Sequence, residues 1–258
     1  MTAPAKTSLC HATPDDILVR GRSLPREILG KTTFTEMIYF HLTGRDPTPA
    51  QTAVLDACLV TLMEHGLTPT AISARLTYAS APEAMQGAVA AGLLGVGSLF
   101  VGTTEGCAEL LARIAGAADP QAEARAIARA SRETGARLPG FGHPLHRPVD
   151  PRTIALFAIA RDHGGFGAHC AALDLLSAAV DAETGRAIPV NATGAVAALI
   201  ADAGLPISIL RGIALISRCA GLVGHIREEQ TTPAMRALWE GAEAAVTYAP
   251  PSTEENDR

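Results

Sequence analysis

The chain has 258 residues, a length that fits one large domain or one domain with an inserted subdomain. Hydrophobic residues make up 48% of the chain and charged residues only 18%, so we expect a full core and further surface that is hidden in an oligomer. The net charge of −5 excludes a global basic field for a nucleic-acid backbone, although a few arginines still suffice for a small anion.

The cysteines argue for a reducing environment. Their number, 5, is odd, and no two of them stand at the spacing of a zinc or redox motif. We therefore expect a cytoplasmic protein with free thiols. Residues 1–15 lack the apolar centre of a signal peptide, and the most apolar stretch, residues 87–102, is too short to span a bilayer, so we expect no membrane partner.

Apolar residues at helical spacing predict helices along most of the chain. Thr33 and Glu36 form a capping box that opens a helix reaching Leu42, and Gly44 ends it. Further helices are expected over 49–65, 68–80, 82–100, 105–115, 120–130, from 151 onward, 167–181, 193–203, 208–227 and 233–245. Asp150 is expected to cap the helix that begins at Pro151. Residues 15–19 are the single strand candidate, so the predicted fold class is all-α.

One long loop, residues 137–151, interrupts the helices. It is dense in proline and also carries glycine, arginine and the histidines His143 and His146. Ordered loops of this length are often functional, and arginines beside a histidine and a helix start suit an anionic ligand. The alternative is a structural loop whose arginines pair with Asp150 or with neighbouring glutamates.

The same loop resembles a known family. Gly140-Phe141-Gly142-His143, followed by Arg147 and by Asp150-Pro151-Arg152, resembles the signature loop of the citrate synthase family. Stretches at 18–44, 188–194 and 214–225 add to this resemblance, which covers about residues 16–230. The short chain and the segment 92–104 are more similar to the citryl-CoA lyase branch than to full-length citrate synthases.

The resemblance implies a fold and an activity. It implies a large helical subdomain, residues 1–106 and 187–258, an inserted small subdomain, residues 107–186, and a homodimer or higher homo-oligomer. The implied reaction cleaves a CoA thioester such as citryl-CoA to acetyl-CoA and an oxo acid such as oxaloacetate, or runs the reverse condensation. A CoA thioester is then a substrate, and no metal is expected.

The resemblance also implies roles for single residues. His143 matches the histidine that hydrogen-bonds the carbonyl oxygen of the oxo acid, or the hydroxyl in the cleavage direction. Arg152 and Arg218 match arginines that grip its carboxylates, which suits the bidentate guanidinium. Arg147 matches a position near the CoA phosphates. Four neighbouring residues match backbone that lines CoA: Pro139, Gly140, Phe141 and Gly142.

Two positions depart from the synthase pattern. Phe100 stands where the family has a histidine that steadies the enolate, and Thr193 aligns with the catalytic aspartate. A threonine hydroxyl has no useful pKa for proton transfer, so cleavage is favoured over condensation. Glu105 is a candidate replacement acid, with the charge of a helix start as its alternative role. The alternative function is a catalytically impaired homologue that binds CoA or carboxylates as a sensor or partner subunit.

Two other histidines stand close together in a glycine-rich segment. His163 and His169 have no carboxylate or thiolate at the set spacing of a metal site in the sequence. We therefore expect surface or capping positions for both.

Overall fold

The computed structural model describes residues 4–97 and 102–250. The chain divides into two compact units, the first made of residues 1–62 and 98–216 and the second of residues 63–97 and 217–258. The predicted small subdomain, residues 107–186, lies within the first unit, and its separation from the rest stays a prediction.

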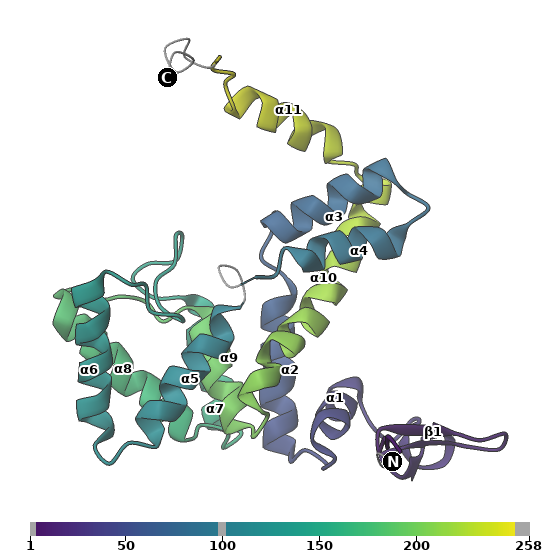
Figure 1. Ribbon diagram of the computed structural model, residues 1–258, viewed down its shortest axis with the longest axis horizontal. Coiled ribbons are helices and arrows are strands. Elements are labelled where there is room, and N and C mark those ends of the chain that lie inside the picture. Colours follow the sequence, from purple (N-terminus) through teal and green to yellow (C-terminus); the bar gives the residue numbers. More distant parts are fainter. Residues whose placement is uncertain (1–3, 98–101, 251–258) are drawn as a thin grey trace. The chain divides into compact units, whose positions relative to one another are not determined.

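The described residues are mostly helical, which confirms the predicted class (Figure 1). The first unit contains α1 (Phe34–Thr43), α2 (Pro49–Met63), α5 (Thr103–Ala115), α6 (Pro120–Thr134), α7 (Pro151–Asp162), α8 (Ala168–Thr184) and α9 (Ala192–Asp202). A short 3-10 helix, Ile207–Ile209, leads into α10 (Leu210–Thr231), which starts in the first unit and continues into the second. The second unit adds α3 (Pro69–Ser80), α4 (Met85–Leu94) and α11 (Met235–Ala245).

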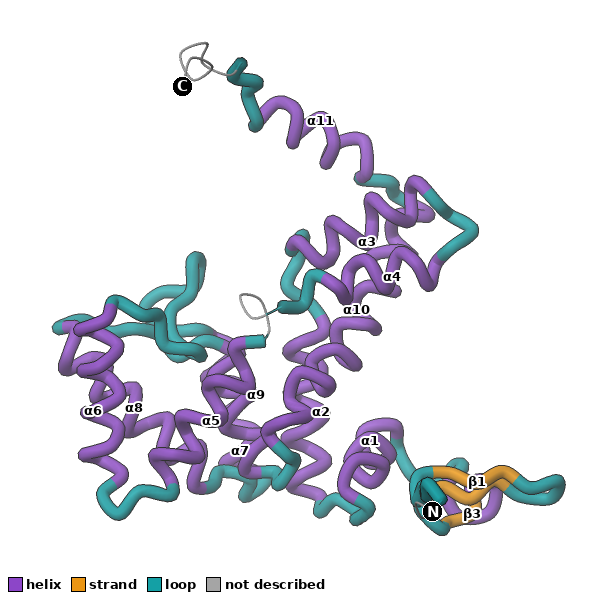
Figure 2. The backbone as a smooth tube through the Cα atoms, in the orientation of Figure 1, coloured by secondary structure: helices purple, strands orange, loops and turns teal. Residues whose placement is uncertain are grey.

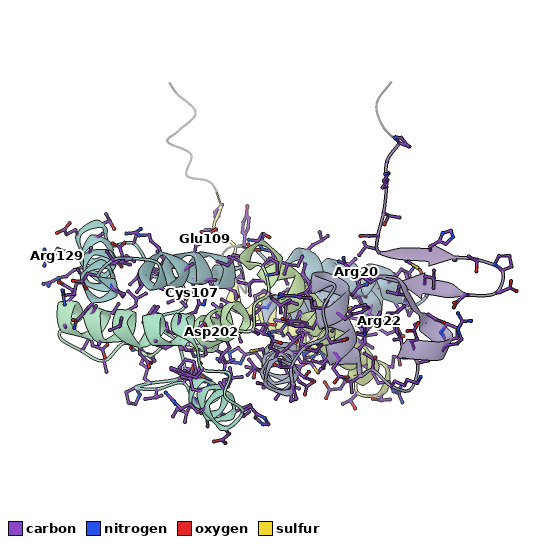
Figure 3. The ribbon with its side chains drawn as sticks, turned by 90° about the horizontal axis from the view of Figure 1, so that it is seen from below. Arg20, Arg22, Cys107, Glu109, Arg129 and Asp202 are labelled. Atoms are coloured by element: carbon purple, nitrogen blue, oxygen red, sulfur yellow. The ribbon has the colours of Figure 1, made fainter. Side chains whose placement is uncertain are left out.

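A small antiparallel sheet precedes the helices, in the order β1 (Cys10–Ala12), β2 (Ile17–Val19) and β3 (Arg22–Ser23). The predicted strand near residues 15–19 is β2, whereas β1, β3 and the following π-helix, Leu24–Ile28, were not predicted. Arg20 and Arg22 (Figure 3) join the sheet to α1. Arg20 donates to the His41 carbonyl at 2.7 Å, and the guanidinium of Arg22 lies 4.3 Å from the centre of the Phe40 ring.

Local signals set most helix ends correctly. Thr33 and Glu36 form the predicted capping box, and Gly44 ends α1 at a φ of 74°, which favours glycine. The prediction for residues 82–100 was wrong at both ends, because α4 begins at Met85 and stops at Leu94. Residues 98–101, which include Phe100, lie outside the described part of the chain.

The core of the first unit fixes the start of α9. Helix α5 packs against α8 and α9, α6 packs against α8, and α7 packs against α9 (Figure 2). Fully or almost fully buried side chains from these helices include Leu111, Ile114, Leu173, Leu176, Leu199 and Ile200. Since every residue of α9 from 194 to 200 is buried, this helix has little freedom to move.

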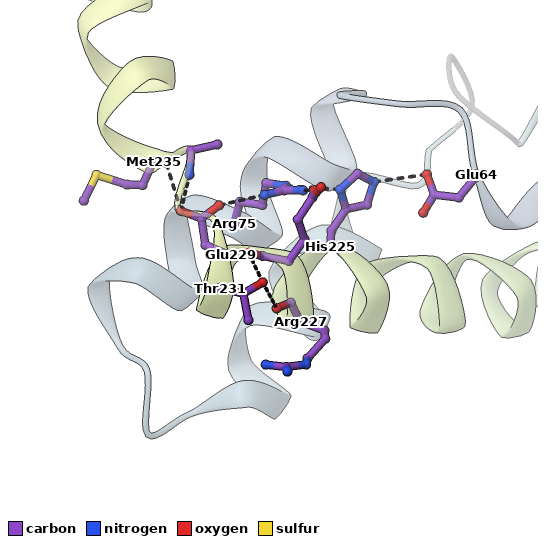
Figure 4. Close-up of polar contacts among 9 residues, drawn as sticks. Glu64, Arg75, His225, Arg227, Glu229, Thr231 and Met235 are labelled. Carbon is purple, nitrogen blue, oxygen red and sulfur yellow. Dashed lines mark hydrogen bonds and ion pairs between the residues drawn. The ribbon is translucent and has the colours of Figure 1, made fainter.

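The second unit is held by a buried charge network (Figure 4). Arg75 on α3 is 2% exposed and donates to His225 at 3.1 Å and to Glu229 at 2.8 Å, and it also pairs with Glu228. His225 in turn lies 3.1 Å from a carboxylate oxygen of Glu64. The network connects α3 to the end of α10. Its buried polar groups have hydrogen-bond partners, which offset the loss of water on burial.

One described helix, Ile207–Thr231, has the length and composition to cross a membrane, with 39% of its most apolar window buried inside the protein. Its Ile213, Ala214 and Leu222 are fully buried. Core helices of globular proteins have the same length and composition.

Candidate active site

The predicted functional loop between α6 and α7 pairs with the segment that leads into α9. Gly142 donates its amide to the Pro189 carbonyl at 2.8 Å, and Asn191 donates its amide to the Gly140 carbonyl at 3.0 Å. The side-chain amide of Asn191 also donates to the Gly142 carbonyl at 2.9 Å. Its oxygen caps α9 by accepting from the amide of Gly194 at 3.1 Å. Asn191 thus fixes the loop against the start of α9.

Glycine allows this close approach. Gly140 has a φ of 86°, and a Cβ placed on it would lie 2.6 Å from Cys107 Sγ and 2.9 Å from Gly194 Cα. A Cβ on Gly194 would lie 2.6 Å from the Gly140 carbonyl oxygen. On the other side, a Cβ placed on Gly106 of α5 would lie 3.6 Å from the Pro139 ring, which is ordinary van der Waals distance. The predicted CoA-lining backbone therefore lies between the starts of α5 and α9.

The hydrogen bonds of His143 determine its tautomer. Nδ1 accepts from the backbone amides of Leu145 at 3.1 Å and His146 at 3.0 Å. A nitrogen that accepts two hydrogen bonds carries no proton, so the neutral ring is protonated on Nε2. The ring stacks on that of His146, with centroids 4.4 Å apart and planes at 26°. His143 is therefore held as a hydrogen-bond donor through Nε2.

Arg152 lies directly beside this donor. Its Nη2 is 3.3 Å from His143 Nε2. Because both groups are donors, neither accepts from the other, and an oxygen placed between them would receive two hydrogen bonds. This convergence of two donors, one of them cationic, is typical of an anion site.

Asp150 holds Arg152 in place. Its carboxylate is fully buried and accepts from Arg152 Nε at 3.0 Å and Nη2 at 2.7 Å. It also accepts from the backbone amides of Arg152 at 3.0 Å and Ala192 at 3.2 Å. Burial by itself raises the pKa of Asp150, but the bonds from Arg152 and Ala192 outweigh this effect and lower the pKa below its usual value. The predicted cap of α7 is confirmed, and it also links α7 to α9.

The remaining predicted residues of the first unit lie around this loop and on α5 and α9. Thr193 is the second residue of α9, half-buried, and next to the Ala192 amide that binds Asp150. Arg147 is exposed, and its Nε lies 3.4 Å from the His143 carbonyl. Glu105, in the first turn of α5, forms an ion pair with Arg211 at 2.9 Å, so part of its charge is neutralised. Its catalytic role stays a prediction.

Arg218 belongs to the second unit. The residue is 6% exposed, and its buried Nε and Nη1 have no hydrogen-bond partner among residues 4–97 and 102–250. Burial lowers the pKa of Arg218, and Glu64 partly offsets the shift. A buried cation with unmet donors is costly unless an anion satisfies them, so the predicted carboxylate-binding role suits this residue.

His143, His146 and Asp150 form the arrangement nearest to a metal site in the described chain. Their potential ligand atoms lie within 4.8 Å of one another. Arg152 Nη2, however, is 2.7 Å from the Asp150 carboxylate and 3.3 Å from His143 Nε2. A guanidinium in that position repels a cation, so the group is better suited to an anion.

Two contributors to this site were underestimated in the sequence. His146 was noted only as a loop residue, although its amide and ring both contact His143. Asn191 was assigned no role in the site, although it bonds to the loop backbone and to α9. The sequence offers one signal for His146, which is that it follows His143 by three residues. His163 is the exposed cap at the end of α7, as expected. His169, expected at the surface or as a cap, is half-buried in the first turn of α8, and its ring lies 2.8 Å from Asp202, which accepts from amides at the start of that helix.

Comparison with known proteins agrees with this fold. Residues 10–238 match the family model described as the C-terminal domain of citrate synthase, and the chain belongs to the citrate synthase family. A solved structure of citryl-CoA lyase from Hydrogenobacter thermophilus is similar at a TM-score of 0.85 with 30% identity, covering 96% of each chain. Because the two chains match over nearly their full lengths, the comparison agrees with the predicted citryl-CoA lyase branch.

Longer proteins contain the same fold. The ATP citrate lyase of Methanothrix soehngenii, solved with citrate and coenzyme A, matches with a TM-score of 0.82 and 18% identity, over 100% of this chain and 44% of that one. The citrate synthase of Acidithiobacillus ferridurans is 25% identical over 199 residues, which is 74% of this chain and 50% of that protein. The chain thus spans about half the length of the curated relatives it matches.

Proposed function

We propose that this protein cleaves the carbon–carbon bond of a β-hydroxy acyl-CoA thioester, releasing an acyl-CoA and an oxo acid. The observation that carries the proposal is the convergence of His143 Nε2 and Arg152 Nη2, 3.3 Å apart, at a rigid loop. One donor suits the hydroxyl or carbonyl oxygen at the reacting carbon, and the guanidinium suits a carboxylate on the same molecule.

The choice of cleavage as the direction rests on Thr193. Condensation requires a base that removes a proton from the methyl group of the acyl-CoA, and a threonine hydroxyl is too weak for this. Cleavage forms the enolate directly, and water can protonate it. The likeness over the full chain to a citryl-CoA lyase supports the same direction and suggests citryl-CoA, acetyl-CoA and oxaloacetate as the first compounds to test.

We assign the CoA part of the substrate to the loop backbone of Pro139, Gly140, Phe141 and Gly142, with Arg147 close to the phosphates. Gly140 and Gly142 have positive φ values of 86° and 78°, and a backbone without side chains lets a ligand approach closely. Arg147 is exposed beside this backbone, where a guanidinium can bind a phosphate without being buried. Arg218 remains the candidate for a second carboxylate.

A cleavage assay tests the proposal. Purified protein is incubated with citryl-CoA, and the release of acetyl-CoA and oxaloacetate is followed, with binding measured in parallel as a thermal shift by CoA thioesters. We expect turnover that His143→Ala abolishes and that His163→Ala, a change in an exposed histidine outside the loop, leaves intact. Binding without turnover by the wild-type protein would instead favour the alternative of a sensor or partner subunit.

We also propose a homodimer or higher homo-oligomer in the cytoplasm. Helix α11 has no buried residue, and apolar side chains lie exposed on it and just after it: Trp239 at 60%, Val246 at 76% and Tyr248 at 82%. Covering such a surface in a second copy would remove it from water. All 5 cysteines are free thiols, which suits a reducing compartment. Light scattering that gives a monomer at micromolar concentration would contradict the oligomer.

A further inference from the structure

We propose that His146 is the acid–base residue of this site, and that His143 acts as a fixed hydrogen-bond donor. The inference rests on the proposed lyase function. It starts from His143, whose Nδ1 accepts from two backbone amides at 3.1 and 3.0 Å. To take up a proton, the ring would have to lose both bonds and become cationic 3.3 Å from Arg152 Nη2. His143 is therefore suited to stabilise an oxygen and poorly suited to accept its proton.

Three other candidate groups among the described residues of the site, Asp150, Glu105 and Thr193, are poorly suited to act as a base. Asp150 is fully buried and accepts bonds from Arg152 and from the Ala192 amide, and its pKa is lowered, which makes it a weak proton acceptor. Glu105 is paired with Arg211 at 2.9 Å. Thr193 offers only a hydroxyl. Imidazole is the side chain that exchanges protons near neutral pH, which directs attention to His146.

The geometry of His146 suits the task. Its ring is half-buried and stacked on His143, with centroids 4.4 Å apart. One of its ring nitrogens lies within 4.8 Å of a ring nitrogen of His143. An oxygen bound beside the stacked rings is then within reach of His146 directly or through one water, which is the reach that general acid–base catalysis requires.

The proton and electron balance of the step closes. The substrate hydroxyl gives its proton to His146, and the O–H electron pair becomes the second bond of the new carbonyl. The carbon–carbon bond breaks, and its electrons form the enolate of the CoA thioester. The enolate carbon takes a proton from water, and the resulting hydroxide accepts the proton from His146. His143 and Arg152 hold the oxo acid throughout.

The test compares His146→Gln and His146→Phe with the wild type and with His163→Gln, a matched change in an exposed histidine. The phenylalanine variant keeps an aromatic ring for the stack but removes the titrating group. We measure kcat and KM for citryl-CoA cleavage from about pH 5.5 to about pH 8.5, a range across which imidazole changes charge. Added imidazole is tested as a rescue of His146→Ala.

We expect both His146 variants to lose roughly 10²- to 10³-fold in kcat, with KM within about threefold of wild type and without the acidic limb of the pH profile. Imidazole should restore part of the activity of His146→Ala. Wild-type kcat in either variant would overturn the inference, as would a loss of kcat that leaves the acidic limb in place, since that marks a structural role. A wild-type protein that cleaves no CoA thioester contradicts the proposed function itself, before any variant is compared.

Discussion

Replacing Asp150 by asparagine tests the anchor of the proposed anion site. Asp150→Asn keeps the shape of the side chain but turns one of its two acceptor oxygens into a donor NH2 group. The two oxygens accept four hydrogen bonds from Arg152 and Ala192, two at each oxygen. In either orientation of the new amide, its NH2 group faces two of these four donors and can accept from neither.

The cost follows from those two lost bonds. A hydrogen bond to a charged group contributes about 1.5 to 3 kcal/mol, and the lower value applies because the Arg152 side chain is 26% exposed and can be hydrated. We therefore expect the free energy of unfolding to fall by about 3 kcal/mol, which lowers Tm by roughly 6 to 12 °C in a chain of this length. Urea unfolding at neutral pH measures the change, with Asp162→Asn, at the exposed end of the same helix, as control.

The pH dependence gives a second check on the same substitution. The folded-state pKa of Asp150 is depressed, so its contribution is complete above the pKa of the unfolded chain, about 3.9 for an aspartate. The contribution is lost as pH falls through the lower, folded-state pKa. The difference between wild type and Asp150→Asn should then shrink below about pH 4. A difference under about 1 kcal/mol at neutral pH, or one that does not change with pH, would refute the ionised anchor.

Substitutions at three further positions test the site, and a glycine on α11 provides a control. Thr193→Asp should raise the exchange of acetyl-CoA methyl protons with deuterated water, followed by NMR, because it supplies a carboxylate at the start of α9. If the exchange rate does not rise, the lack of a carboxylate at position 193 is not what limits proton removal. His143→Ala should abolish cleavage and lower Tm by only a few degrees, because it removes two amide bonds to Nδ1 in a half-exposed loop. His143→Gln should retain part of the cleavage because its amide still donates. A fall in Tm of more than about 10 °C in His143→Ala would mark a structural histidine. Gly194→Ala should cost about 1 to 3 kcal/mol in urea unfolding, since its Cβ would lie 2.6 Å from the Gly140 carbonyl oxygen. Gly241→Ala, where a Cβ meets nothing within 4 Å, should instead stabilise by about 0.5 to 1 kcal/mol, and equal effects would contradict the close approach.

The parts of the fold that the sequence predicted depend on neighbours in the chain. The capping box of Thr33 and Glu36 and the cap by Asp150 each need a side chain and an amide within three residues. The proline-rich loop could also be predicted, because closely spaced prolines disrupt the interior of helices and strands. The helix expected over 82–100 was too long because an apolar run does not by itself mark where a helix stops, and α4 ends at Leu94.

The contacts that build the candidate site join distant segments, and no local pattern encodes them. The Asn191 side chain meets Gly142 across 49 residues, and the Ala192 amide meets Asp150 across 42. In the second unit, Arg75 meets Glu229 across 154 residues. Tertiary packing decides which partners meet, so the sequence identified His143 and Arg152 as candidates but could not determine the tautomer of the histidine.

The threonine at position 193, where the resemblance to citrate synthases implies an aspartate, also affects the charge at the start of α9. A helix start carries a partial positive charge that favours a nearby anion, and an aspartate there would be held in its ionised form. The Asp150 carboxylate already accepts from the Ala192 amide at this helix start, and Thr193 adds no second carboxylate beside it. In the proposed cleavage, an enolate would therefore meet less negative charge here than an aspartate at position 193 would impose. Such a site stabilises the products of bond breaking better than it removes a methyl proton. If proton transfer then falls to His146 on the loop, anion binding and acid–base chemistry are separated onto different elements, and the two can be tested by independent substitutions.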